Sequence, residues 1–266
     1  MTKRPKILLT NDDGIHAPGL RSLWQALVDY ADLTIVAPMD DMSGSGAGIT
    51  LKSPLRLEPV SCDRQTPAWK TSGKPADCVK LGLGALLTEK PDLVLSGINR
   101  GSNLGRTLFY SGTVGGVIEG ALKQIPGIAF SCEDFHNPDY QAAEKYVLSL
   151  VQHTLEHPLP FGTVLNVNFP DASKPHRGFK FARQGFGFWG NHPDERTHPT
   201  EGTPYFWLGG DWQHHDENEN SDVALLQQGY ITVVPIRVDE LTHHDWIASH
   251  QEVFEMKMNP EGMHNV

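Results

Sequence analysis

The 266-residue sequence has few cysteines, few basic residues and no long apolar run, and each shortage excludes a class of protein. Its three cysteines, Cys62, Cys78 and Cys132, form no Cys-x-x-Cys pair, which argues against a disulfide or zinc framework and for reduced thiols in the cytoplasm. Lys and Arg total 22 against 32 Asp and Glu, so a duplex nucleic-acid partner is not expected. No apolar run reaches the roughly 18 residues of a membrane span, so no membrane partner is expected either.

The first two-thirds of the sequence alternates strand and helix patterns. Short apolar runs predict strands at 7–9, 33–37, 93–95, 128–130 and 164–167. Apolar residues at helical spacing predict helices over 20–28, 77–87, 113–123 and 140–155. This order predicts an α/β fold with a Rossmann-like, mostly parallel sheet and helices on both of its faces.

The last third of the sequence has a different pattern. Glycine, proline, histidine and aromatic residues crowd 171–220, and one strand returns at 230–235. We therefore expect residues 1–170 to form an α/β metal- and phosphate-binding core, with an extended insertion at about 48–72. Residues 171–266 are expected to form a β-rich C-terminal extension that is not an independent domain.

Small polar residues follow three of the predicted strands. The first strand ends at Asp12 and Asp13, the second is followed by Ser43, and the central one by Asn99. Ligands of parallel sheets bind at the carboxyl ends of the strands, where these residues converge. Adjacent carboxylates favour a cation between them, and carboxylate, hydroxyl and amide oxygens suit Mg²⁺, Mn²⁺ or Ca²⁺ better than zinc. Taken singly, each residue is equally compatible with a turn or a helix cap.

A glycine-rich loop provides a candidate phosphate site. Glycines recur every fourth residue from Gly97 to Gly105, which lets backbone amides approach a ligand, and Asn103 lies among them. The loop is followed by Ser111, Gly112 and Thr113, which open a predicted helix whose free amides and dipole favour an anion. A simple helix cap is the alternative for this motif.

Three other patterns predict no site. The Gly-x-Gly-x-x-Gly run at 185–190 has no strand-then-helix context, so it is not a dinucleotide site. The histidine pairs at 214–215 and 243–244 lack zinc-site spacing. The acidic run at 216–220 is interpreted as a solvated loop.

The segment at 7–19, ILLTNDDGIHAPG, closely resembles the opening signature of the SurE-type survival-protein nucleotidases. The segments at 96–105 and 110–114 resemble the second and third signatures of this family. Further similarity runs from about residue 6 to about residue 245 and includes 75–79, 162–168 and 221–224.

This resemblance implies a metal-dependent phosphomonoesterase, a 5′/3′-nucleotidase that hydrolyses nucleoside 5′- and 3′-monophosphates, and some family members also trim short polyphosphate. It implies one divalent metal ion, with ligands at Asp12, Asp13, Ser43 and Asn99, and phosphate contacts at Asn103, Ser111, Gly112 and Thr113. It also implies a homodimer or homotetramer that exchanges C-terminal elements, which agrees with the aromatic residues of the extension.

Several alternatives stay open from the sequence. Asp12 or Asp13 could act as general base or as nucleophile besides binding metal. An aspartyl-phosphate phosphatase of another α/β class normally has Asp-x-Asp after its first strand, whereas these carboxylates are adjacent. A non-catalytic nucleotide- or metal-binding module is the other alternative. Lys74, Arg100 and Arg106 leave the substrate preference open, because such cations favour longer anions.

Overall fold

The computed structural model describes residues 4–190 and 192–258. A nine-stranded sheet runs in the order β3-β4-β2-β1-β5-β6-β7-β13-β8. Six neighbouring strands are parallel: β4 (Ala68–Thr71), β2 (Asp32–Pro38), β1 (Lys6–Thr10), β5 (Leu93–Arg100), β6 (Gly127–Cys132) and β7 (Thr163–Phe169). The segment expected as an insertion adds β4 and the antiparallel β3 (Leu57–Pro59) to this sheet, with the short helix η1 (Asp63–Gln65) between them. The predicted mostly parallel α/β sheet is confirmed.

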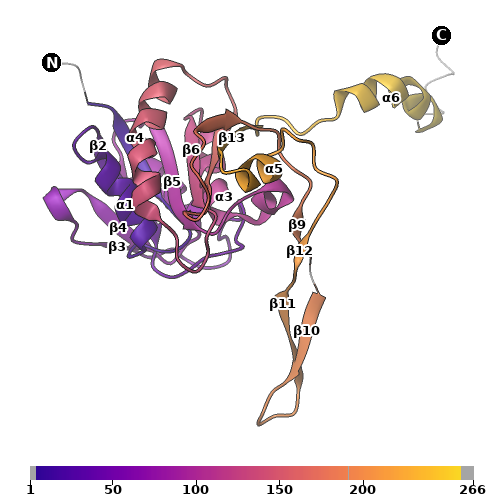
Figure 1. Ribbon diagram of the computed structural model, residues 1–266, viewed down its shortest axis with the longest axis horizontal. Coiled ribbons are helices and arrows are strands. Elements are labelled where there is room, and N and C mark those ends of the chain that lie inside the picture. The colour runs from indigo at the N-terminus through magenta and orange to yellow at the C-terminus, as the bar shows by residue number, and fades with distance from the viewer. Residues whose placement is uncertain (1–3, 191, 259–266) are drawn as a thin grey trace.

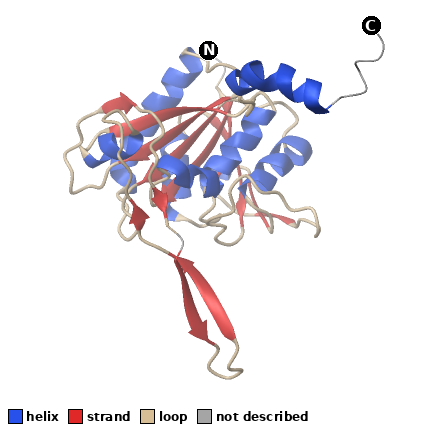
Figure 2. Ribbon diagram, turned by 90° about the vertical axis from the view of Figure 1, so that its right-hand side faces the viewer, coloured by secondary structure: helices blue, strands red, loops and turns tan. Residues whose placement is uncertain are grey.

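Helices cover both faces of the sheet, as Figure 2 shows. The helices α1 (Pro18–Leu27) and α4 (Tyr140–Glu156) pack with Ile7 and Leu9 in one core. On the other face, α2 (Pro75–Leu81), the π-helical turn η2 (Gly82–Leu86) and α3 (Gly112–Leu122) pack around Leu8. Successive strand residues point to opposite faces, so this alternation along β1 supplies both cores. No helix in the described ranges is long and apolar enough to cross a bilayer.

Part of the C-terminal extension joins the main sheet, and another part projects away from it. The strands β13 (Ile231–Arg237) and β8 (Phe179–Phe181) join the main sheet beside β7. The strands β9 (Phe188–Trp189) and β12 (Trp212–Gln213) pair with each other, and beyond them the hairpin of β10 (His192–Thr197) and β11 (Pro204–Gly209) projects from the body of the molecule (Figure 1).

Two helices of the extension were not predicted. The helix α5 (Asp222–Gln227) has only six residues, too few to show helical periodicity. The helix α6 (His244–Met258) has no buried residue, and the sequence analysis assigned no helix to this segment. It lies apart from the sheet and its covering helices (Figure 1).

The strand order explains where a site can form. From β1 the chain runs outward through β2 and β4, then returns to place β5 on the other side of β1. The switch point therefore lies between β1 and β5, and in open α/β sheets ligands bind there, beyond the carboxyl ends of the strands. Thr10 pairs with Ser96 at this end, so residues that follow them lie close together.

Candidate active site

Asp12 follows β1 and lies buried against the start of α3. The hydroxyl of Thr113 donates to its Oδ1, and the Met42 N–H donates to its backbone oxygen at 2.8 Å. A Cβ added to Gly112 would lie 2.9 Å from Asp12 Oδ2, so this oxygen faces the first turn of α3. Burial, with a smaller contribution from Asp13, raises the pKa of Asp12 to about 6, although the Thr113 hydrogen bond opposes the shift.

Asp13 and Asn99 lie on either side of the switch point. The Arg100 N–H donates to Asp13 Oδ2 at 3.3 Å, which brings the end of β5 to the end of β1. Burial is the main cause that raises the pKa of Asp13, and Asp41 adds to it. The side-chain nitrogen of Asn99 donates to the Gly101 oxygen at 2.8 Å, which leaves the amide oxygen as the group available to a ligand.

The loop after β2 carries Ser43 and Ser45. Ser43 is exposed, and its N–H donates to Asp41 Oδ1 at 2.8 Å. The buried Ser45 Oγ has no hydrogen-bond partner within the described residues. It would lie 2.6 Å from a Cβ added to Gly112, and so beside the same first turn of α3 that Asp12 faces. Sequence reasoning missed Ser45, although the surrounding glycine-rich run was visible.

These oxygen groups fit a hard divalent cation. Across residues 4–190 and 192–258, no cluster of three or more His, Cys, Asp or Glu could hold a metal, so a metal here depends on Ser43 and Asn99 as well. Neither Asp12 nor Asp13 forms an ion pair with a described Lys, Arg or His. Because their pKa values are raised, a positive charge placed between them would stabilise the ionised forms.

The start of α3 offers an anion site beside these carboxylates. Ser111 is the N-cap, and its Oγ accepts a hydrogen bond from Val114 N–H at 3.1 Å. The first amides of a helix have no partner within it, and the helix dipole favours negative charge there. The Thr113 hydroxyl is bound to Asp12, so Thr113 helps to orient that carboxylate.

The glycine-rich loop requires glycine at two close backbone approaches. Gly97 has φ +121°, and a Cβ there would lie 2.3 Å from the Phe130 oxygen. Gly105 has φ +52°, and a Cβ there would lie 2.4 Å from the Gly187 oxygen. The short helix η3 (Gly105–Tyr110) then leads into α3. The predicted glycine spacing therefore reflects contacts with β6 and with the C-terminal extension, besides any approach to a ligand.

Asn103 is held by two asparagines of β7. Its N–H donates to Asn168 Oδ1 at 2.8 Å, and its oxygen accepts from Asn166 Nδ2 at 2.7 Å. Its own side-chain nitrogen donates to Ser131 Oγ at 2.8 Å, which directs the amide toward β6. Sequence reasoning gave no role to Asn166 and Asn168, although two polar residues alternating within an apolar strand are a visible signal.

The fold and the site define a class of α/β protein that binds a phosphate ester together with a metal ion. Two adjacent carboxylates that form no ion pair within the described residues lie at the switch point of a mostly parallel sheet, and one of them, Asp12, faces the first turn of α3.

Comparison with known proteins identifies the family. The family model "Survival protein SurE" matches residues 7–191. The chain is 44% identical over 261 residues to the 5′-nucleotidase SurE of Protochlamydia amoebophila, with 97% of this chain and 100% of that protein covered. It is 39% identical over 246 residues to the 5′-nucleotidase SurE of Christiangramia forsetii, with 91% and 94% covered. The crystal structure of the SurE protein from Aquifex aeolicus matches with a TM-score of 0.79 at 35% identity, over 94% of this chain and 100% of that one. The chain belongs to the SurE family, as the resemblance implied.

Proposed function

We propose that this chain is a nucleotidase that hydrolyses nucleoside 5′- and 3′-monophosphates to nucleoside and phosphate, with one divalent metal ion. The observation that supports it most directly is the contact between Asp12 and the first turn of α3. The Asp12 carboxylate lies against the first turn of α3 and accepts a hydrogen bond from Thr113. A metal ion held by Asp12 and a phosphate held at the start of α3 would therefore be neighbours.

Each residue of the site has a role in this proposal. Asp12, Asp13, Ser43 and Asn99 hold the metal ion, which supplies Lewis-acid stabilisation of charge on the phosphate. Ser111, Gly112 and Thr113 at the start of α3, together with Asn103, bind and orient the phosphate oxygens and stabilise the charge that develops on them. Mg²⁺ or Mn²⁺ is the expected ion, and Ca²⁺ has the same ligand preference. Trapping of a phosphorylated Asp would distinguish a nucleophile from a general base.

The proposed site contacts the phosphate group of a nucleotide more than its base. We expect base discrimination within about 10–200-fold, and poor cleavage of diesters, because the proposed contacts are all with a terminal phosphate group. The three cations noted in the sequence lie around the site. Arg100 lies over the Phe135 ring at 4.5 Å, Arg106 over Phe186 at 5.3 Å, and Lys74 Nζ would be 3.2 Å from a Cβ on Gly48. They support a proposed secondary activity on short polyphosphate.

Phosphate release under multiple turnover tests the function. The substrates are AMP, GMP, CMP, UMP, a 3′-monophosphate, a cyclic diester and short polyphosphate, each with Mg²⁺, Mn²⁺, Ca²⁺ or EDTA. We expect release from several monophosphates, dependent on metal. Strict specificity for one base, faster cleavage of the diester, or full activity in EDTA would contradict the proposal.

The proposal includes assembly into a homodimer or homotetramer in the cytoplasm. The hairpin of β10 and β11 exposes Phe206, Trp207 and Leu208 to 56%, 66% and 77%, and α6 exposes further apolar residues. Apolar patches of this kind favour a protein partner, here a second copy of the chain. The three cysteines are unpaired, which supports a reducing compartment. Light scattering that shows only monomer at working concentration would contradict the assembly.

A further inference from the structure

One buried carboxylate, that of Asp222 at the start of α5, joins the C-terminal extension to the glycine-rich loop. The Gly105 N–H donates to Asp222 Oδ2 at 3.0 Å. Its Oδ1 accepts from Gly185 N–H at 2.8 Å and from Val223 N–H at 2.9 Å. The carboxylate therefore connects three backbone segments: the loop after β5, the segment before β9, and its own helix.

The two segments held by Asp222 also touch each other directly. The Arg106 N–H donates to the Gly187 oxygen at 2.9 Å, and the exposed Gln184 donates to the Gly105 oxygen at 3.0 Å. A Cβ on Gly185 would lie 2.9 Å from Asp222 Oδ1. The glycines at 185 and 187, which have no dinucleotide role, therefore allow the extension to approach the loop.

The loop is thus fixed at two points, one at the proposed phosphate contact Asn103 and one two residues beyond it, at Gly105. Asn166 and Asn168 hold Asn103 from β7, and Asp222 holds Gly105 two residues further on. From Gly105, η3 runs directly to Ser111 at the start of α3. A shift of Gly105 therefore moves the segment between two proposed phosphate contacts, and a displacement of about 1 Å in a site can cost about 100-fold in rate.

Within the described chain, the carboxylate of Asp222 has no cation to offset its burial. Asp222 is fully buried and forms no ion pair with a Lys, Arg or His of the described residues. Burial raises its pKa to about 6 despite three backbone hydrogen bonds, and the like charge of Glu217 adds to the shift. An ionised carboxyl without a cation is costly to bury, and such costs occur mostly at functional sites.

We propose that Asp222 is a positioning residue for phosphate binding: it holds Gly105, and thereby the loop that leads into α3, in the arrangement that binds the substrate. This inference rests on the proposed function of the same site. It makes the C-terminal extension a part of the active site and not only a surface for subunit contacts.

The test replaces Asp222 by asparagine in the full-length chain. The amide oxygen of the new side chain keeps the bonds to Gly185 and Val223, whereas its NH₂ group faces the Gly105 N–H, so two donors meet where a hydrogen bond was. The matched control is Glu217→Gln. Glu217 accepts bonds from Phe186 and Gly187 N–H in the same segment, and no hydrogen bond joins it to the described loop at 101–110.

The expected result separates activity from stability. Asp222→Asn should lower kcat for AMP by about 10–100-fold at a temperature well below its measured Tm, where the variant is folded, and Glu217→Gln should keep kcat within about twofold. Gln184→Ala removes the hydrogen bond between an exposed side chain and the Gly105 oxygen, and it should lower kcat by about threefold with Tm unchanged. This variant tests the position of the loop if Asp222→Asn does not fold. The proposal is overturned if kcat is unchanged in Asp222→Asn, or in Gln184→Ala where Asp222→Asn does not fold. It is also overturned if Glu217→Gln loses as much kcat as Asp222→Asn.

Hydrogen exchange gives a readout that is independent of turnover. Amides at 101–110 should exchange faster in Asp222→Asn than in wild type and Glu217→Gln, because the Gly105 bond is lost. Unchanged exchange overturns the proposal. If wild type releases no phosphate from any monoester, the proposed function fails, while this exchange result still decides whether Asp222 holds the loop.

Discussion

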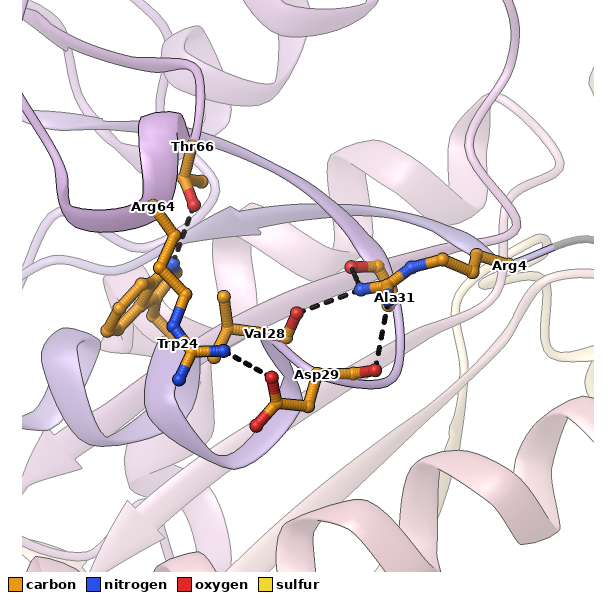
Figure 3. A network of polar contacts seen from close by, with 7 residues as sticks. All are labelled: Arg4, Trp24, Val28, Asp29, Ala31, Arg64 and Thr66. Carbon is orange, nitrogen blue, oxygen red and sulfur yellow. Dashed lines mark hydrogen bonds and ion pairs between the residues drawn. The ribbon is translucent and has the colours of Figure 1, made fainter.

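The two ends of the parallel strands differ in how their acidic residues are paired with cations. At the amino ends of the strands, three cations have acidic partners: Arg4 pairs with Asp32, Lys6 with Glu89, and Arg64 with Asp29. Figure 3 shows part of this network, where the Arg4 guanidinium also donates to the carbonyl oxygens of Val28, Asp29 and Ala31. At the carboxyl ends, Arg100 pairs with Asp41 and Lys174 with Glu133, but Asp12 and Asp13 form no ion pair within the described chain. The Arg100 charge and N–H only partly oppose the rise in the pKa of Asp13.

The same strands build both edges, so the difference reflects what each edge binds. Exposed ion pairs contribute little to stability, but they leave no charge that requires a ligand. Buried carboxylates without a cation cost stability and have raised pKa values. Charge that is compensated within the chain therefore indicates structure, and uncompensated charge indicates a site for a ligand.

The largest effect should come from removing one uncompensated carboxylate. Asp12→Asn or Asp13→Asn should lower the phosphatase rate at least ~100-fold, because each removes a primary electrostatic element of the site. Tm in EDTA should stay unchanged or rise, since a costly buried charge is gone. Phosphate release and thermal unfolding measure the two quantities.

Metal binding gives the control for this variant. Mn²⁺ should raise the Tm of wild type, because an ion that binds the folded state stabilises it, and should raise that of Asp13→Asn far less. The distinction between the two edges would be contradicted if Asp13→Asn were fully active. It would also be contradicted if Mn²⁺ raised the Tm of both proteins equally.

The second effect tests whether the anion site must touch Asp12. In Gly112→Ala, the new Cβ would lie 2.8 Å from Asp12 Cβ and 2.6 Å from Ser45 Oγ, so the carboxylate or the helix must move. We expect kcat/KM to fall between about 10-fold and 100-fold. Gly84→Ala is the control, since no atom lies within 4 Å of its added Cβ. Similar kcat/KM values for the two variants would show that the close contact is unimportant.

The third effect concerns the cost of a buried carboxylate. The pKa of Asp222 is raised from 3.8 to about 6, so the folded state holds this proton more tightly than the unfolded state does. The contribution of Asp222 to stability is therefore fully present below about pH 4 and is lost as the pH rises to about 6. Urea unfolding of wild type and Asp222→Asn should show the wild-type free energy of unfolding falling relative to the variant by on the order of 2 kcal/mol over that range. A wild-type advantage that grows with pH would reverse the assigned sign.

Local patterns were sufficient to predict the core, and they single out the residues proposed for the centre of the site. Strands and helices of the first 170 residues have strong periodicity, and Asp12 and Asp13 stand out because two acids follow a buried strand. The parallel topology then brings the ends of β1 and β5 together without further information. The order of strands and helices in the sequence was therefore enough to predict which segments meet at the carboxyl ends of the strands.

Contacts between distant segments could not be predicted in this way. Asp222 and Gly105 are 117 residues apart, and their bond involves a backbone N–H that any residue but proline would supply. The acidic run at 216–220 was interpreted as a solvated loop, yet the Glu217 carboxylate accepts bonds from Phe186 and Gly187 N–H. Side chains that bind backbone groups leave no signature of their partner in a single sequence.

The smallest effect should come from the compensated edge. Arg4→Ala removes hydrogen bonds to three carbonyl oxygens beyond the end of α1 and an exposed ion pair with Asp32, and water can replace these partners. We expect a loss of about 1 kcal/mol in the free energy of unfolding and phosphatase activity within about twofold of wild type. Asp32→Asn, which removes only the ion pair, should have a still smaller effect on unfolding. A loss of activity in Arg4→Ala without a matching loss of stability would mean that the amino-end edge also serves the reaction, and the contrast between the two edges would then fail.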